Sequence, residues 1–164
     1  MLKGYRSQGI PAEKHRAEER SKRAVNYKNR TASAKETQVM STIEAGLRYA
    51  KTHEWARLES DGTVSVGISD HAQAALGDVV YIELPALNST LTAEQAVGVV
   101  ESVKAASDIH APISGTVIAV NEGLTEAPEG VNTHPYQSWF YRIQPSNPDE
   151  LQQLLDADGY QAIC

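Results

Sequence analysis

The sequence predicts a mainly β domain, a small barrel or sandwich with a few added helices. Three observations support this prediction: short apolar runs recur along the chain, turn residues separate them, and only two stretches have the pattern of a helix. Strands of this length bury an apolar face against a second layer or close into a barrel.

The distribution of charge divides the chain into two parts. Residues 1–39 contain ten basic and four acidic residues, a net charge of +6, whereas residues 40–164 contain five basic and seventeen acidic residues, a net charge of −12. The segment PAEKHRAEERSKRA at 11–24 is polar on every side, so a helix there would have no face to bury. We therefore expect 1–39 to be a basic, mostly disordered extension and 40–164 to be the folded domain, with Met40 resembling a second start.

The acidic domain excludes several classes of function. It would repel the phosphates of nucleic acid and suits brief encounters with proteins that have basic docking surfaces.

No apolar run approaches the length of a membrane span, and no secretory signal is present. The single cysteine, Cys164, excludes an internal disulfide and a zinc site built from cysteines. We expect a monomer in the cytoplasm; a mitochondrial matrix location would need 1–39 to act as a transit peptide.

The first strands are predicted around a turn at Asp61-Gly62, which follows the segment EWARLES. After this turn, Val64, Val66 and Ile68 alternate with Thr, Ser and Gly over 63–68, the period of a half-buried strand. Further strands are predicted at 78–85, 96–103, 108–114, 115–121 and 139–145.

The first predicted helix covers 69–77. Ser69 or Asp70 supplies the N-cap, and Gly77 ends the helix.

The second predicted helix covers 147–159, near the end of the chain. Asn147 is its N-cap, Glu150 occupies the capping-box position, and Gly159 ends it. A packing stripe is formed by Leu151, Leu154 and Leu155.

The segment VGVVESVKAASDIHAPISGTVIAV places one lysine between two apolar strands. A connection of about four residues fits a hairpin, so Lys104 is expected at an exposed tip. Two alanines follow it directly, and the carboxylates of Glu101 and Asp108 lie three residues before it and four after it. Lys51 is the only other lysine in the domain, so Lys104 does not belong to a generally basic surface. A solvated turn lysine, or a helical turn with two ion pairs, are the plainer alternatives.

Patterns of enzyme active sites are absent from the sequence. HEWAR begins like the helix of a zinc protease, but Arg57 stands where the second histidine is needed. There is no nucleophile elbow and no phosphate-binding glycine loop. The histidines of the domain also lack the spacing of metal ligands, so no metal is expected: His53, His71, His110 and His134. A small hydrolase or metal enzyme built on His53, Glu54 and His71 remains the rival from another class.

At this point the sequence resembles the H-protein family of the glycine cleavage system, whose members are lipoyl carriers. The resemblance extends from about Leu47 to Ala162 and leaves residues 1–39 outside it. It rests on an ordered set of motifs: YAKTHEW, DGTVSVGISDHAQAALGDVV, ELP, VESVKAASD, the pattern AP-S-G-V-AVN, and SNPDELQQLLDA.

The resemblance implies a fold, a cofactor and partners. The fold would be a flattened β sandwich of the lipoyl/biotinyl carrier type, with added helices and a C-terminal helix. Lys104 matches the position that carries lipoate in amide linkage, and Glu101 the residue recognised by the lipoate-attaching enzyme. The lipoyl arm would accept an aminomethyl group from glycine at a pyridoxal-phosphate glycine decarboxylase. It would then present that group to a tetrahydrofolate-dependent aminomethyltransferase and be reoxidised by dihydrolipoyl dehydrogenase.

The resemblance also implies a cleft that holds the loaded arm out of water. By position, Glu54, Ile68 and Asp108 would line it. Solvated charge for the carboxylates and plain core packing for Ile68 are the alternatives. Two segments depart from the family pattern: Ala74-Ala75, where many members have larger residues, and PYQSWF at 135–140, which is one residue shorter and lacks a glycine.

Other carrier roles stay open. A biotin carrier shares the fold, but its lysine is usually flanked by methionines, where this chain has Val103 and Ala105. A lipoyl relay to 2-oxoacid dehydrogenases would use the same Lys104, and an unmodified relative would carry nothing on it.

Overall fold

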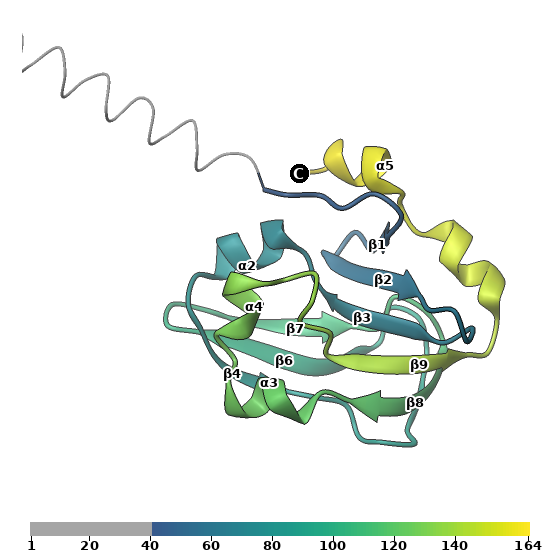
Figure 1. Cartoon of the computed structure of the whole chain (residues 1–164), viewed down its shortest axis with the longest axis horizontal. Helices are drawn as coiled ribbons and strands as arrows, with labels where there is room; N and C mark the ends of the chain where they lie inside the picture. The colour runs from purple at the N-terminus through teal and green to yellow at the C-terminus, as the bar shows by residue number, and fades with distance from the viewer. Residues whose placement is uncertain (1–40) are drawn as a thin grey trace, which may run out of the picture. The chain divides into compact units, whose positions relative to one another are not determined.

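A computed structural model describes residues 41–164, so the expectation for residues 1–39 lies outside the described residues. The described part is built from two antiparallel sheets and short helices (Figure 1). The larger sheet has the strand order β1-β2-β3-β9-β8-β5, with β1 (Arg48–Tyr49), β2 (Glu54–Leu58), β3 (Val64–Ile68), β9 (Tyr141–Pro145), β8 (Gly115–Val120) and β5 (Thr90–Leu91). The smaller sheet has the order β4-β6-β7, with β4 (Val79–Glu83), β6 (Ala96–Ser102) and β7 (Ala106–His110).

The main core is a cluster to which both sheets contribute. Val66 and Ile143 come from the larger sheet and Val100 and Ile109 from the smaller one, and all four are buried. Each such side chain contributes roughly 1.5–3 kcal/mol when it leaves water. The predicted alternation over 63–68 is thus confirmed in its inward residues. Every residue of β3 is buried, since the ring of Trp55 lies against Gly67 and the side chain of Arg142 donates to Ser65.

A second core cluster connects the end of the chain to β1 and β2. Tyr49 and Tyr160 stack with their ring centroids 4.3 Å apart, and Trp55 and Tyr136 complete the aromatic group. The indole N–H of Trp55 donates to the carbonyl of Pro135 at 3.0 Å, so the buried polar atom of the ring is satisfied. This cluster holds the C-terminal segment beside residues 49–55.

The first predicted helix is confirmed as α2 (Asp70–Leu76). Ser69 is its N-cap, because its Oγ accepts from the amide of Ala72 at 3.1 Å. Gly77 ends it with φ +79° and ψ −156°, a backbone conformation that is almost confined to glycine.

The single helix predicted over 147–159 is wrong. The chain forms a 3₁₀ helix, η1 (Pro148–Gln153), and then a short helix, α5 (Ala157–Gln161). Leu155 separates them because its backbone pairs with Tyr49, through hydrogen bonds of 2.8 and 2.9 Å. Gly159 lies inside α5 and does not end the helix.

Of the predicted capping box, the N-cap Asn147 is confirmed and the role of Glu150 is wrong. Asn147 caps η1, since its side chain accepts from the amide of Asp149 at 3.1 Å. Glu150, however, accepts from the amide of Ser114 at 2.6 Å, so its carboxylate ties η1 to the sheet. A tertiary contact has replaced the local one.

Two short helices between β8 and β9 were not predicted, α3 (Glu122–Glu126) and α4 (Gly130–Thr133). They are too short to show a helical period in the sequence. Asn132 of α4 donates to the carbonyl of Gly77 and accepts from the amide of Val79, both at 2.9 Å. Through these bonds α4 fixes the segment that leads from α2 into β4.

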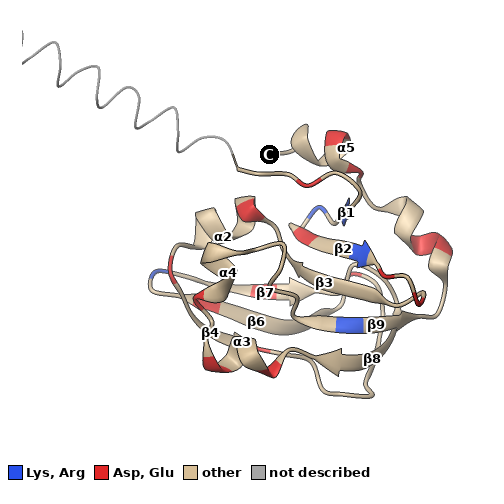
Figure 2. Ribbon diagram, viewed as in Figure 1, with Lys and Arg blue, Asp and Glu red and all other residues tan. Residues whose placement is uncertain are grey.

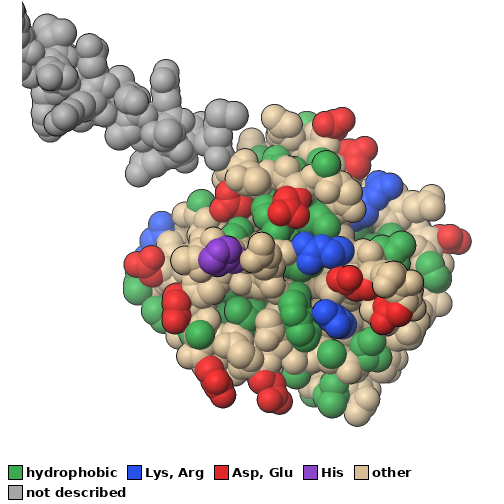
Figure 3. Space-filling view, viewed as in Figure 1, with side chains coloured by type: hydrophobic (Ala, Val, Ile, Leu, Met, Phe, Trp, Pro, Cys, Tyr) green, Lys and Arg blue, Asp and Glu red, His purple; other side chains and the backbone are tan. Residues whose placement is uncertain are grey.

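The surface of the described part carries the acidic excess of the sequence. In Figure 3, red acidic side chains are spread over the visible face and blue ones are few. None of the helices in residues 41–164 is long and apolar enough to cross a membrane.

Candidate functional site

Lys104 lies at the tip of the hairpin that joins β6 and β7, as predicted. The two strands pair as far as Glu101 and Ala106, and Val103, Lys104 and Ala105 form the connection. Ser102 closes this tip, because its Oγ accepts from the amides of Lys104 and Ala105 at 3.3 and 3.0 Å. The helical-turn alternative is therefore wrong. Figure 2 shows a blue segment at the end of this hairpin, at the left of the view.

The surroundings of Lys104 leave its amine accessible. Lys104 is exposed, and the neighbouring Val103 has 70% of its surface exposed. The side chain of Lys104 passes close to the end of α2: a methyl group added to Gly77 would lie 3.3 Å from Cε and 3.9 Å from Nζ. Glu101 is exposed on β6, opposite Tyr81 of β4 and Ala106 of β7.

A cleft of about 280 Å³ lies between α2, the edge of β2 and the β6–β7 hairpin. All three residues predicted to line a cleft line this one: Glu54, Ile68 and Asp108. Ala105 and Ala106, which directly follow Lys104, form part of the same wall. The exposed lysine and the cleft are therefore adjacent.

Glu54 is a buried carboxylate, so the alternative of solvated charge is wrong for it. Its exposed fraction is 1%, and its Oε1 accepts from the amide of His110 at 2.8 Å. The hydroxyl of Thr52 donates to its Oε2. Burial raises the pKa of Glu54 above its ordinary value, while these two hydrogen bonds act in the opposite direction.

Tyr141 adds an unsatisfied polar atom to this region. Its side chain is buried, and among the described residues its hydroxyl has no hydrogen-bond partner. Burial raises the pKa of Tyr141, and the charge of Glu54 raises it further. Tyr141 belongs to the main core and is not among the residues that line the cleft, so its hydroxyl lies outside the cleft wall.

Ile68 and Asp108 occupy different parts of the cleft wall. Ile68 pairs with Glu54 across β2 and β3, and it belongs both to the core and to the cleft, so core packing and cleft lining are compatible. Asp108 is exposed on β7 and pairs with Val99. Of the two alanines that depart from the family pattern, Ala75 lines the cleft, whereas Ala74 is exposed and does not.

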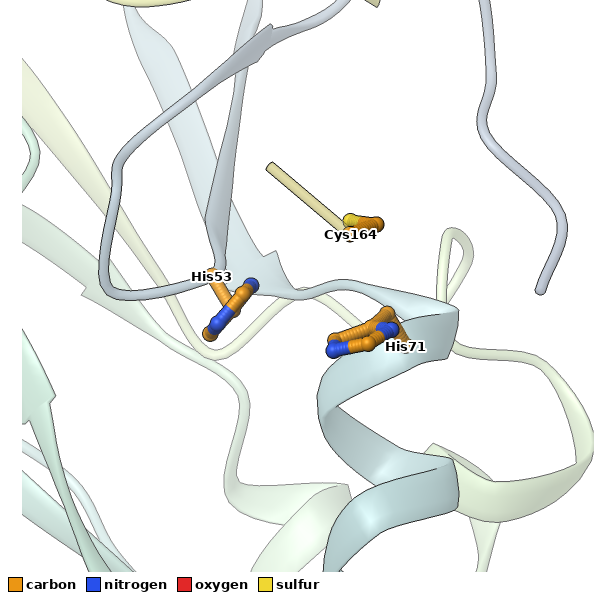
Figure 4. Close-up of side chains that lie close together, drawn as sticks. All are labelled: His53, His71 and Cys164. Carbon is orange, nitrogen blue, oxygen red and sulfur yellow. The ribbon is translucent and has the colours of Figure 1, made fainter. Parts of the chain in front are cut away.

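The residues of the rival enzyme are only partly brought together, because His53 and Glu54 line the cleft and His71 does not. His53 and His71 are close, with ring centroids 4.9 Å apart, but the carboxylate of Glu54 is engaged by Thr52 and His110. Cys164 joins the histidines instead, and the possible ligand atoms of the three residues lie within 4.8 Å of one another (Figure 4). The spacing of these residues in the sequence gave no sign of this cluster.

Comparison with known proteins agrees with this geometry. The family model described as glycine cleavage H-protein matches residues 47–164. Glycine cleavage system H protein 2 of Pseudomonas aeruginosa is 69% identical over 123 residues, which cover 75% of this chain and 95% of that protein. The glycine cleavage system H protein of Methylococcus capsulatus is 60% identical over 125 residues, or 76% of this chain and 98% of that protein.

A solved structure is similar as well. The crystal structure of a glycine cleavage system H protein from Mycobacterium marinum superposes with a TM-score of 0.68 at 36% identity, covering 73% of this chain and 97% of that one. The predicted fold class, mainly β of the lipoyl-carrier type with a few short helices, is thereby confirmed.

Proposed function

Because the chain belongs to the glycine cleavage H-protein family, whose members are carrier components and not catalytic enzymes, we propose that Lys104 carries lipoate in amide linkage. One observation carries this proposal: Lys104 lies exposed at a hairpin tip, directly beside a cleft that contains a buried carboxylate. Among residues 41–164 the only other lysine is Lys51, in the turn between β1 and β2, away from any hairpin tip of the smaller sheet.

The residues around Lys104 fit a long attached arm. The connection of Val103, Lys104 and Ala105 offers no bulky neighbour other than Val103, whose side chain points into solvent. A cleft of about 280 Å³ is close to the lower end of the range for small-molecule sites, roughly 300–1,000 Å³. Its mixed wall, with Ile68 on one side and Glu54 at the floor, suits an apolar arm that ends in a polar group.

Lys104 would hold the lipoyl group in amide linkage, and the group would supply a cyclic disulfide able to take up the aminomethyl group of glycine when carbon dioxide is lost at the decarboxylase. A tetrahydrofolate-dependent aminomethyltransferase would remove the one-carbon unit and release ammonia, and dihydrolipoyl dehydrogenase would reoxidise the remaining dithiol. The partners are four enzymes: the pyridoxal-phosphate glycine decarboxylase, the aminomethyltransferase, dihydrolipoyl dehydrogenase and the lipoate-attaching enzyme. We place these encounters in the cytoplasm of a bacterium, because the relatives named above are bacterial.

The cleft residues have separate tasks in this proposal. Glu54 accepts a hydrogen bond from the polar end of the arm and favours a protonated amine through its charge. Ile68 covers the apolar part of the arm and keeps water away. Asp108, at the exposed rim, adds a second carboxylate near the entrance. Glu101 is the contact for the lipoate-attaching enzyme, because it is exposed on the strand that leads into the tip.

The proposal is tested by a peptide mass map of the protein purified from its native cells. One lipoyl group is expected on the peptide that contains Lys104 and none on the peptide that contains Lys51. Lys104→Arg should abolish the modification and glycine-cleavage activity in a reconstituted system, at a cost in stability of about 0.5 kcal/mol or less, because the side chain is exposed.

The matched control is Lys51→Arg, which changes the other exposed lysine of the domain and should leave the modification intact. An unmodified Lys104, in cells whose other lipoyl proteins are modified, would refute the proposal. A biotinyl mass on Lys104 would instead identify the alternative carrier.

A further inference from the structure

The cluster of His53, His71 and Cys164 belongs neither to the hairpin tip nor to the polar floor of the cleft. Its members come from three separate segments: the turn before β2, the first turn of α2, and the turn that follows α5. Figure 4 shows the three side chains directed toward a common space. Both histidines are half-buried and the cysteine is exposed, so the space is open to solvent on one side.

The histidines are held in place by contacts that exist without any ligand. The backbone of His53 has φ +79°, an unusual conformation for a residue with a side chain, and it is kept there by hydrogen bonds to Ala50 and from Ser69, of 3.0 and 2.9 Å. The hydroxyl of Tyr160 hydrogen-bonds both Nδ1 of His53, at 2.7 Å, and Oγ of Ser69, at 2.6 Å. Partners of this kind orient the imidazole rings of metal-binding sites.

The cysteine reaches the cluster through the end of the chain. After α5, the amides of Ile163 and Cys164 donate to the carbonyls of Tyr160 and Gln161, at 3.1 and 3.3 Å. This turn places Cys164 within 4.8 Å of the histidine ligand atoms.

We propose that His53, His71 and Cys164 bind a divalent transition-metal ion of borderline softness, with Zn²⁺ as the representative ion. Two imidazoles and a thiolate are ligands that Zn²⁺ prefers, and three protein ligands leave a fourth position open. In a tetrahedral site with bonds of about 2.0–2.3 Å, ligand atoms lie roughly 3.3–3.8 Å apart. The cluster, at 4.8 Å or less, needs a contraction of at most about 1.5 Å between its ligand atoms to reach this geometry.

This site is independent of lipoylation. His53 lines the cleft as well, so an occupied metal site would adjoin the cleft. The metal is nevertheless bound by side chains alone, and its binding can be measured on the full chain without lipoate. Failure of the metal proposal would thus leave the carrier proposal untouched, and the reverse also holds.

The test is a competition titration of the reduced, unlipoylated full-length protein with Zn²⁺ against a chromophoric chelator. One Zn²⁺ per chain is expected. His53→Gln, His71→Gln and Cys164→Ser should each weaken binding at least tenfold. Tyr160→Phe, which keeps the ring stacked on Tyr49, should weaken it about 10–100-fold through the loss of orientation.

The matched controls are His134→Gln and His15→Gln, which remove an exposed histidine outside the cluster and the histidine of the N-terminal extension. Both should bind Zn²⁺ as the parent does. A second readout uses Co²⁺, whose thiolate charge-transfer absorption should be present in the parent and absent in Cys164→Ser. Circular dichroism confirms that each variant is folded.

The proposal is overturned if binding is not saturable at one ion per chain. It is equally overturned if any of the three ligand variants, while folded, keeps the parent affinity, or if His15→Gln abolishes binding.

Discussion

Folding opposes the ionisation of Glu54. Its carboxylate is 1% exposed, and burial raises its pKa although Thr52 and His110 donate hydrogen bonds to it. The folded state therefore holds a proton on this carboxylate more tightly than the unfolded chain does. The stability that follows from this difference is present below the ordinary pKa of about 4.5 and is lost as the pH rises through the raised pKa.

We expect Glu54→Gln to become more stable relative to the parent as the pH rises above about 4.5. The reason is that glutamine keeps the volume and an acceptor for the His110 amide but carries no charge into the cleft floor. Where the folded and unfolded states of the parent differ by one bound proton, the difference in free energy of unfolding between Glu54→Gln and the parent changes by about 1.4 kcal/mol per pH unit. Urea unfolding of both proteins across this range measures it.

Comparing Glu54→Gln with the parent isolates the contribution of the Glu54 carboxylate to the pH dependence of stability. Burial, aided by His71, lowers the pKa of His53, so the folded state takes up a proton there less readily and loses stability as the pH falls. That contribution is common to the parent and the variant and cancels in the difference. Parallel pH profiles would show that Glu54 does not ionise with a raised pKa.

Glu101 carries a prediction of its own at the same scale. Its exposed carboxylate, three residues before Lys104, makes no hydrogen bond or ion pair with the described residues. Glu101→Ala should slow lipoylation by a purified attaching enzyme about tenfold, equivalent to about 1.4 kcal/mol, the scale of one hydrogen bond to a charged group. Glu83→Ala, an exposed glutamate on the neighbouring β4, is the control and should be modified at the parent rate. Equal rates for all three proteins would assign Glu101 to the solvated surface.

At the scale of elements, the end of α2 controls the geometry beside Lys104. Gly77 turns the chain out of the helix, and Asn132 of α4 accepts from Val79 and donates to Gly77, so the turn is held from two sides. The side chain of Lys104 passes within van der Waals contact of this glycine position. The hairpin and the helix end therefore form one side of the entrance to the cleft.

We expect Gly77→Ala to lower the free energy of unfolding by about 1–3 kcal/mol, because its φ and ψ lie in a region almost confined to glycine. Thermal or urea unfolding measures the loss. Gly123→Ala in α3 is the matched control: its φ is not positive, and the new methyl group would meet only Oδ1 of Asn121 at 3.4 Å. That control should be neutral or slightly stabilising. An equal effect of both substitutions would contradict the strained-turn explanation.

At the scale of the whole molecule, we expect the acidic excess of the domain to govern how it meets its partners. Residues 40–164 carry seventeen acidic and five basic residues, and the acidic ones are spread over the visible surface (Figure 3). A carrier that visits several enzymes needs encounters that are fast and brief. Attraction between an acidic carrier and basic docking surfaces raises the association rate more than it raises affinity.

The KM of dihydrolipoyl dehydrogenase for the lipoylated protein should therefore rise with salt, while kcat changes little. Screening shortens the reach of charge from about 10 Å at 0.1 M salt to about 3 Å at 1 M. The control substrate is free lipoamide, which is uncharged, so its KM should stay constant over the same salt series. A KM for the protein that is equally constant would exclude electrostatic attraction as the source of the encounter rate.

The sequence alone predicted the β class, most strands and the position of Lys104 at an exposed hairpin tip. These features depend on local physics: alternation over 63–68, the glycine turns, and a short polar connection between two apolar runs. The resemblance of its motifs also pointed to Glu54, Ile68 and Asp108, which the structure brings to one cleft. Their roles there stay predictions.

The tertiary structure alone decided what depends on contacts between distant segments. The helix predicted over 147–159 is broken because Leu155 pairs with Tyr49, and Glu150 leaves its capping position to bind Ser114. Neither partner is adjacent in sequence, so no local pattern could reveal them. The burial of Glu54 beneath the cleft and the meeting of His53, His71 and Cys164 have the same origin, since folding brings together residues that the chain keeps far apart.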